Sequence, residues 1–133
     1  MKECIFCKII KGELPSYKVY EDEKVVAFED INPISKGHTL VIPKKEVDYL
    51  FDLEDDLTAG LHIFTKKVAK AIDKSINCIR VGVLVIGTEV PHAHIHLIPF
   101  NDEAEMNIKR PKLKLSNEEF VEIAKNIQKH FNN

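Results

Sequence analysis

The sequence predicts an α+β protein built on a mainly antiparallel sheet. Two long helical patterns are inserted among short apolar runs of strand length, without the regular alternation of a parallel α/β fold. A further observation concerns His92, His94 and His96, which occupy alternate positions in VPHAHIHLIP. Alternate side chains of a strand point to the same face, so these imidazoles share one face and apolar side chains share the other.

The first half of the chain predicts a short helix, a hairpin and a strand. Residues 4–10 form a turn of helix, and the runs KVY and KVVAF on either side of EDE predict a β-hairpin over 18–28. The segment DINP at 30–33 predicts a turn, because Asn32 directly precedes a proline. The run HTLVIP at 38–43 predicts a third strand, which is entered through a glycine.

The second half predicts a long helix, two strands and a final helix. Apolar residues recur at helical spacing over 53–73, and acidic residues at its start suit the helix dipole. The run CIRVGVLVIG at 78–87 predicts a strand that is apolar on both faces and therefore buried, and the histidine strand follows it. Residues 101–115 are polar, rich in lysine and the least structured segment. A capping-box pattern, SNEE, then begins a helix over about 116–131.

Length and charge restrict the classes of function. A chain of 133 residues is long enough for one domain with its own core. Lysine and arginine total 19 against 21 acidic residues, and the net charge of −2 gives no electrostatic reason to expect nucleic-acid or membrane binding. The basic residues Lys109, Arg110, Lys112 and Lys114 form a local cluster that is typical of a solvated loop.

Targeting features and cysteine usage indicate the compartment. The start of the chain interrupts its apolar residues with lysines, unlike a secretory signal, and no run approaches the ~20 apolar residues that span a bilayer. Three cysteines, two of them close together, do not suggest a disulfide framework. These features predict a cytoplasmic protein.

The histidine row suits two kinds of chemistry. Catalytic zinc sites take three imidazoles and a water. Phosphoryl transfer instead uses histidines as donors to charged oxygens, with one ring attacking phosphorus. Packing alone is a poor explanation, because three unpaired buried imidazoles would lack polar partners, whereas His62 and His130 need no functional role. The spacing does not decide between the two chemistries.

Several motifs in order resemble the histidine triad (HIT) family of nucleotide hydrolases and transferases. They are CIFCKIIKGELP, FEDINP, GHTLVIPK and HAHIHLIP, and the resemblance covers a core over residues 4–100, followed by a C-terminal extension. It implies a homodimer in which each subunit contributes a five-stranded antiparallel sheet and two main helices. It also implies cleavage at the α-phosphorus of nucleoside phosphoramidates, phosphoesters or dinucleoside polyphosphates through a covalent nucleotidyl-histidine, with no metal required.

The resemblance assigns roles to particular residues. It implies that His94 is the nucleophile, that His38 is a further catalytic histidine, and that Asp30 binds the ribose hydroxyls of the nucleotide. Attack by His94 requires one unprotonated nitrogen, so its other nitrogen is expected to donate to a carbonyl and fix the tautomer. His92, His96 and His38 are then expected to donate to phosphoryl oxygens. The remaining nucleotide-binding residues would form an apolar slot for a purine base and donate a hydroxyl to phosphate: Phe6, Phe28, Ile31 and Thr88.

Three positions depart from the family pattern. Val81 and Thr88 stand where the family usually carries asparagine and glutamine, and Glu89 stands where a small hydroxyl residue is common. A carboxylate at this place would repel an anionic substrate unless it points away, is protonated or meets a basic leaving group. The departures motivate an alternative, a nucleotide-binding regulatory protein with little catalysis.

The pair Cys4 and Cys7 forms half of a tetrahedral zinc site. Zinc-bearing members of the family take the other two ligands from a histidine after the IPK segment and from the first triad histidine. Those positions hold Glu46 and His92 here, so the four residues could hold a structural zinc ion. The alternatives are a reduced pair packed beside Phe6, and a zinc hydrolase that uses all three triad histidines as ligands.

Overall fold

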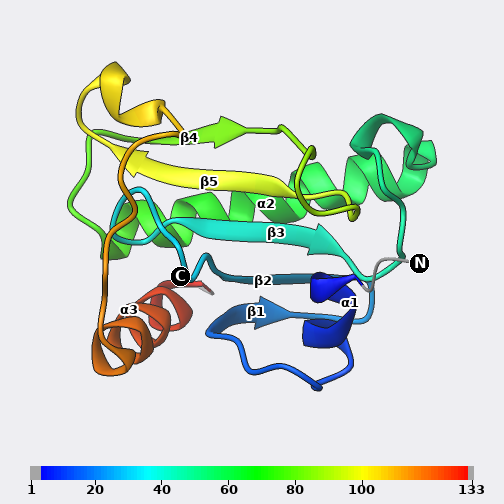
Figure 1. The fold of residues 1–133 in the computed structure, drawn as a ribbon, viewed down its shortest axis with the longest axis horizontal. Helices are drawn as coiled ribbons and strands as arrows, with labels where there is room; N and C mark the ends of the chain where they lie inside the picture. Colours follow the sequence, from blue (N-terminus) through cyan, green and yellow to red (C-terminus); the bar gives the residue numbers. More distant parts are fainter. Residues whose placement is uncertain (1–3, 132–133) are drawn as a thin grey trace.

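The computed structural model describes residues 4–131, and its centre is a five-stranded antiparallel sheet (Figure 1). The strand order is β1-β2-β3-β5-β4, so that β3 and β5 lie inside the sheet although more than fifty residues separate them along the chain. The strand bounds are β1 Lys18–Glu21, β2 Val25–Glu29, β3 Thr39–Pro43, β4 Arg80–Leu84 and β5 Ile95–Phe100. The predicted α+β architecture is confirmed.

The helices follow the predicted patterns closely. The long helix predicted over 53–73 is α2, Asp55–Ser75, and the final helix is α3, Asn117–His130. Ser116 caps α3: its side chain accepts from the Glu119 backbone N–H and the Glu119 carboxylate accepts from the Ser116 N–H, which is the predicted capping box. The shorter helices are α1, Ile5–Ile10, and two 3₁₀ segments, η1 Leu50–Asp52 and η2 Glu103–Met106.

The sheet buries side chains on both faces. One face packs on α2 and α3, and its core residues include Ala27, Val41, Ile95 and Leu97. The other face lies under α1, which Figure 1 shows in front of the strands while α2 lies behind them. This second face carries Val26, Phe28, Leu40, Ile42 and the triad histidine of β5. Burial on both faces explains the continuous apolar runs of the central strands.

The strand over 78–87 differs from its prediction. Its ladder is shorter, Arg80–Leu84, and it occupies an edge of the sheet, where Ile79, Val83, Val85 and Ile86 are exposed. The expectation of a strand buried on both faces is wrong for this chain on its own. An apolar run predicts burial, but it does not say whether the chain itself or another molecule covers the strand.

The histidine strand also begins later than its pattern predicts. β5 starts at Ile95, so His92 and His94 precede the ladder. The segment before β5 is held by a hydrogen bond to a part of the sequence far from it: the Ala93 N–H donates to the Val47 carbonyl at 2.7 Å. Only His96 therefore lies within a regular strand, and the other two rings take their directions from local contacts.

Within residues 4–131, no helix is both long and apolar enough to cross a bilayer.

Candidate active site and thiol cluster

His38 and His96 are joined by a hydrogen bond whose direction the backbone determines. The Ile34 N–H donates to His38 Nδ1 at 3.2 Å, so the proton of this ring must be on Nε2. That Nε2–H then donates to His96 Nδ1 at 2.9 Å. His96 consequently carries its own proton on Nε2, the nitrogen that remains available to a ligand. This relay fixes the tautomers of two rings through one main-chain amide.

Burial keeps the relay uncharged at neutral pH. The pKa of His38 is lowered to about 3 by desolvation, with smaller contributions from the His96 and Lys112 charges. Desolvation likewise lowers the pKa of His96 to about 4, aided by His94 and Lys112. Both rings are therefore neutral, and His96 can act as a neutral hydrogen-bond donor toward developing charge.

His94 is arranged as a base or nucleophile. Its Nδ1 lies 2.7 Å from the backbone carbonyl of His92, and a carbonyl can only accept. The proton of His94 is therefore on Nδ1, which leaves a lone pair on Nε2. The ring lies 5.1 Å from that of His96, and the edge of Phe6 packs against it at 5.2 Å. The expected carbonyl partner of His94 is thus present, and the structure identifies it as the carbonyl of His92.

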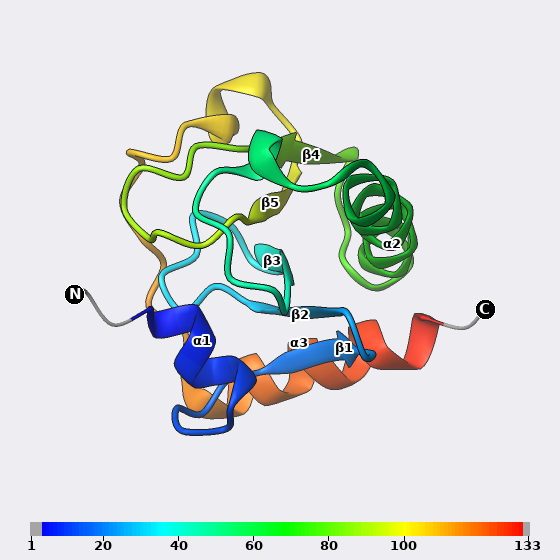
Figure 2. The same cartoon turned by 90° about the vertical axis from the view of Figure 1, so that its right-hand side faces the viewer.

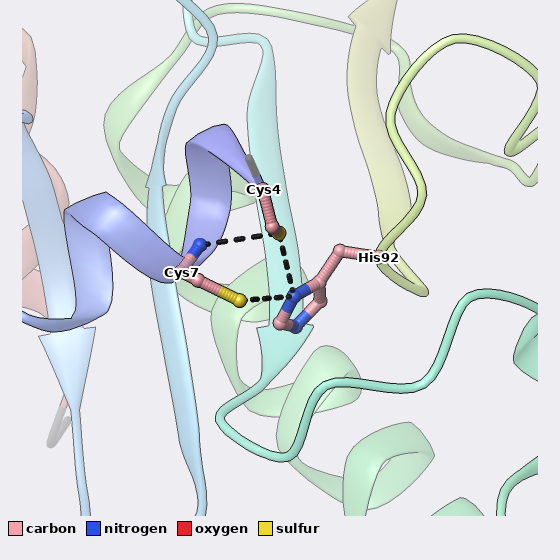
Figure 3. A group of neighbouring side chains, drawn as sticks. All are labelled: Cys4, Cys7 and His92. Carbon is pink, nitrogen blue, oxygen red and sulfur yellow. Dashed lines mark hydrogen bonds between the residues drawn. The ribbon is translucent and has the colours of Figure 1, made fainter. Parts of the chain in front are cut away.

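His92 belongs to a different environment. Its Nε2 lies 2.7 Å from the Pro43 carbonyl and therefore donates to it, so that Nδ1 has a free lone pair. That Nδ1 lies 3.3 Å from Cys4 Sγ and 3.5 Å from Cys7 Sγ. Figure 3 shows the two sulfur atoms converging on this nitrogen from the N-terminal end of α1. Both nitrogens of His92 are thus directed away from the His94 and His96 pair.

The cysteines and His92 form a compact set of metal-ligating atoms. The two sulfurs and a ring nitrogen all lie within 4.8 Å of one another. Burial is the main cause that raises the pKa of the Cys7 thiol to about 12, and the neighbouring Cys4 and the Glu46 carboxylate add to it. Glu46 is exposed and is not part of the converging set, although it lies near enough to act on His92 as well. The structure therefore brings together three of the four residues that the sequence analysis assigned to zinc.

Asp30 lies beside the relay. Its Oδ2 is 3.5 Å from His38 Nε2, while its Oδ1 accepts from the Asn32 N–H at 2.8 Å and so stabilises the turn predicted at 30–33. The pKa of this carboxyl is raised, chiefly by burial, and Glu89 adds to that effect while Lys112 and His94 oppose it. One oxygen thus shapes the turn and the other faces the histidines.

A second set of converging ligand atoms comprises Asp30, His38 and His96. Its hydrogen bonds do not suit a metal ion, because His38 Nε2 must carry a proton when Nδ1 accepts from a backbone N–H. Among the described residues, neither converging set contains all three triad histidines. The alternative of a zinc hydrolase with three histidine ligands does not fit this arrangement, since the His92 ring points to the cysteines.

A family model for the HIT domain matches residues 11–103, more than half of the chain. The chain belongs to the histidine triad (HIT) family. An uncharacterized HIT-like protein of Borreliella burgdorferi is 42% identical over 135 residues, which cover 96% of this chain and 97% of the relative. The adenosine 5'-monophosphoramidase of Schizosaccharomyces pombe is 38% identical over 126 residues, which cover 93% and 95%.

A solved HIT structure shares the whole fold. It is a Zn-bound histidine triad family protein from Mycobacterium smegmatis, with a TM-score of 0.81 and 26% identity over 98% of this chain and 94% of that one. The five-stranded antiparallel HIT fold with two main helices is therefore shown for this chain.

The apolar residues assigned to a base slot separate into two groups. Phe6 of α1 and Phe28 of β2 are buried and pack edge to face with ring centroids 5.5 Å apart, and Phe6 also contacts the ring of His94. Ile31 is instead 62% exposed at the turn that follows Asp30. Phe6 thus lies between Phe28 and the ring of His94, while Ile31 is at the surface next to Asp30.

The three departures from the family pattern lie on or beside the edge strand. Val81 pairs with Pro99 within the β4 and β5 ladder, whereas Thr88 and Glu89 are exposed in the loop before the triad. Glu89 lies near enough to Asp30 to raise the pKa of that carboxyl. The carboxylate of Glu89 is therefore within electrostatic range of Asp30.

Gly37 directs the chain into β3 so that His38 enters the interior. Its φ of +93° is a conformation that favours glycine, and a Cβ at this position would lie 2.9 Å from Ile76 Cγ1. The sequence analysis identified His38 through the family resemblance. It did not identify the main-chain partners of the histidines, the Ile34 N–H and the Pro43 and His92 carbonyls, because no side-chain pattern marks them.

Proposed function

We propose that this HIT protein is a nucleotide hydrolase or transferase that cleaves at the α-phosphorus of nucleoside phosphoramidates, phosphoesters or dinucleoside polyphosphates. The observation that carries the proposal is the pair of fixed tautomers at the site. His94 presents an unprotonated Nε2, and His96 presents a protonated Nε2, with ring centroids 5.1 Å apart. A nucleophile beside a hydrogen-bond donor is what displacement at phosphorus requires.

The reaction proceeds in two displacements at the same phosphorus. His94 Nε2 attacks the α-phosphoryl group, the leaving group departs, and a nucleotidyl-histidine forms. Water then cleaves the phosphorus–nitrogen bond and releases the nucleoside monophosphate. The carbonyl of His92 holds the Nδ1 proton throughout, so positive charge that develops on the His94 ring is stabilised by an oriented dipole.

His96 and His38 have unequal parts in this scheme. His96 Nε2–H donates to a phosphoryl oxygen, since its Nδ1 is already occupied as an acceptor. Both nitrogens of the buried His38 have partners, so it positions His96 and does not itself donate to phosphate. Both nitrogens of His92 are likewise engaged outside the phosphoryl site. The expectation that His92 and His38 donate directly to phosphate does not fit these contacts.

The nucleoside in this proposal lies across Asp30, Phe6 and Phe28. A carboxylate can accept from two vicinal hydroxyls, and the proximity of Asp30 to the histidine pair supports it as the acceptor for the ribose. Phe6 and Phe28 provide apolar contact for a purine base, and Ile31 and Thr88 close the exposed side. The monophosphoramidase activity in the name of the Schizosaccharomyces pombe relative supports a purine nucleotide as the substrate.

The test is a panel of adenosine phosphoramidates, adenylyl esters and dinucleoside polyphosphates, read for release of AMP. His94→Ala should lower turnover by roughly 10³-fold or more, while AMP binding and the thermal midpoint stay close to wild type. His62→Ala, a substitution on the exposed side of α2, is the matched control. Retention of most activity by His94→Ala would contradict the mechanism.

A regulatory role is the second candidate, because Val81 and Thr88 replace the usual asparagine and glutamine of the family and Glu89 adds negative charge within electrostatic range of Asp30. In that case the wild-type chain would bind AMP tightly and release no product from any member of the panel. Robust turnover of one substrate would exclude this candidate.

The cluster of Cys4, Cys7 and His92 fits a structural zinc ion. Two thiols and an imidazole nitrogen with a free lone pair are preferred zinc ligands, and the Pro43 carbonyl fixes the tautomer of His92 from behind. Glu46 would supply the fourth ligand from the exposed side. Catalysis at His94 needs no metal in this proposal, and the Zn-bound relative supports the cluster as a zinc site.

The edge strand supports a homodimer. β4 has an unpaired outer edge and carries exposed Val83, while Ile79, Val85 and Ile86 extend the apolar surface on both sides. Pairing of β4 with a second copy would extend each five-stranded sheet into a shared larger one and cover these side chains. A solution molar mass of a single 15.2 kDa chain at micromolar concentration would contradict this assembly.

A further inference from the structure

A buried carboxyl that the proposed mechanism does not use lies next to the candidate active site. Glu29 is the last residue of β2, and it shares a face of that strand with Val25 and Ala27. This face packs on α2 and α3, and Figure 2 shows α2 and α1 on opposite sides of the sheet. The Glu29 side chain is 2% exposed, so its carboxyl lies in the protein interior.

Within residues 4–131, no hydrogen bond reaches the buried Oε2 of this carboxyl. The hydroxyl of Thr39, the opposing residue of β3, donates instead to the Gly37 carbonyl at 2.9 Å. Tyr17, whose carbonyl accepts from the Glu29 N–H, directs its own hydroxyl to Asn117 Oδ1 at 2.6 Å. An ionised carboxylate here would have neither water nor these donors to stabilise it, so the folded chain holds Glu29 as a neutral acid.

The surroundings of Glu29 determine the sign of its pH dependence. Burial raises the pKa of this carboxyl from its usual 4.5 to about 8, and no charged side chain of the described residues on β1, β3, α2 or α3 contributes to the shift. The titratable groups next to this strand end, Asp30 and His38, are likewise not among its causes. The carboxyl therefore favours the folded arrangement fully below about pH 4.5, and this contribution is lost as the pH rises to about 8.

The same strand end holds two residues of the site. Asp30 directly follows Glu29, and His38 directly precedes Thr39, the residue that opposes Glu29 on β3. The Asp30 N–H donates to the His38 carbonyl at 2.9 Å and closes the end of the β2 and β3 ladder, while Asp30 Oδ2 lies 3.5 Å from His38 Nε2. Exposure of Glu29 to water at this end of the ladder would separate these two segments.

We propose that Glu29 is a pH-sensitive switch of the nucleotide site: loss of its proton opens the end of the β2 and β3 ladder and displaces Asp30 and His38. Nucleotide binding, which needs both residues in place, is then coupled to retention of the proton. The role given to Asp30 rests on the proposed function, but the opening itself requires no substrate.

Hydrogen exchange of the Asp30 amide, followed by NMR from about pH 5 to about pH 8.5, tests the opening. In the wild-type chain its protection factor should fall by about tenfold or more, because each pH unit of titration changes a two-state equilibrium by up to tenfold. Glu29→Gln and Glu29→Leu do not ionise at this position and should keep a nearly constant protection factor. Glu23→Gln, which removes an exposed carboxyl just before β2, is the matched control and should behave as wild type.

Calorimetry with AMP over the same pH range tests the link to the site. The AMP affinity of the wild-type chain should fall about fivefold or more relative to that of Glu29→Gln. Ionisation of the AMP phosphate changes both affinities equally, so the ratio of the two isolates the carboxyl.

Three results would overturn the proposal. The first is the same pH dependence of Asp30 protection in wild type and in both Glu29 variants. The second is an equal loss of protection at amides in the centre of β3, which would indicate unfolding of the whole sheet. The third is a constant ratio of AMP affinities, which would separate Glu29 from the site. Turnover of the substrate panel by the wild-type chain tests the hydrolase independently of all three.

Discussion

The two ends of the histidine row lie in contrasting environments. His92, at one end, has no exposed surface and lies between the Pro43 carbonyl and the sulfurs of Cys4 and Cys7. His96, at the other end, is 7% exposed and is held through His38 by a backbone amide. The two histidines of this alternating row thus differ in their chemistry, because their hydrogen-bond partners come from different segments of the chain.

The middle residue connects the two regions. His94 takes its tautomer from the carbonyl of His92 and lies next to the ring of His96. The cluster that holds the His92 ring therefore also holds the peptide group that orients His94, the proposed nucleophile. The structural region comprises Cys4, Cys7 and His92, and the chemical region comprises His94, His96 and His38. The two regions meet at the backbone carbonyl of His92, and the following experiments separate their roles.

The largest effect is expected on metal content. Cys4→Ser together with Cys7→Ser should reduce bound zinc from about one equivalent per chain to near zero, because hydroxyls are poor zinc ligands. Turnover should fall by less than about tenfold, since no catalytic proton or bond depends on the sulfurs. Elemental analysis of protein purified without added metal measures the first quantity, and AMP release measures the second.

Two further variants make this measurement decisive. Cys78→Ser, which changes a cysteine outside the cluster, should leave the zinc content unchanged. Glu46→Gln should weaken zinc binding by roughly 10–100-fold, as for loss of a weaker or outer ligand. Wild-type protein with a zinc ratio near zero would remove the zinc assignment altogether.

The chemical region should respond in the opposite way. His96→Ala removes the neutral donor and should lower turnover by roughly 10²–10³-fold, the usual loss for one oxyanion donor. Its zinc content should equal that of wild type, because the ring does not contact the sulfurs. A variant that lost zinc and turnover together would show that the two regions are not separable.

The smallest effect concerns the pH dependence of stability. The pKa of buried His38 is lowered to about 3, below the usual value near 6.5. Between these two pH values the His38 ring is protonated in the unfolded chain but stays neutral in the folded chain. Stability contributed by this neutral ring is therefore complete above about pH 6.5 and is lost as the pH falls toward 3. His38→Gln should reduce the slope of unfolding free energy against pH by about 1 kcal/mol per pH unit in this window.

Urea unfolding at several values between pH 4 and pH 7 measures this slope. His62→Gln provides the matched comparison for removal of an exposed histidine. If wild type and His38→Gln had the same slope, the ring of His38 would not be held neutral by its surroundings, and the tautomer relay would lose its support.

Periodicity predicted much of the fold. The apolar spacing located α2 and α3 within about two residues, and the Ser116 capping box marked the start of α3, because these are local preferences of the chain. The prediction that the apolar run containing β4 is buried on both faces was wrong. The same pattern suits a strand covered by its own chain or by another molecule, and strand order, which no local pattern specifies, put β4 at an edge.

The candidate site was predicted less completely than the fold. Family motifs identified His38, His94 and Asp30, because these are side chains at fixed intervals. The motifs also grouped His92 with Cys4 and Cys7 as zinc ligands, and these three converge, but the motifs could not show that the Pro43 carbonyl leaves Nδ1 as the nitrogen that faces the sulfurs.

The amino-acid sequence by itself determined the family, the alternation of faces around the histidine row, and the identity of the groups that can do chemistry. The tertiary structure decided which nitrogen of each ring carries a proton and which main-chain group each ring contacts. The physical reason is that a histidine has two chemically distinct nitrogens, and the partners that distinguish them here include main-chain groups and cysteines far away in the chain.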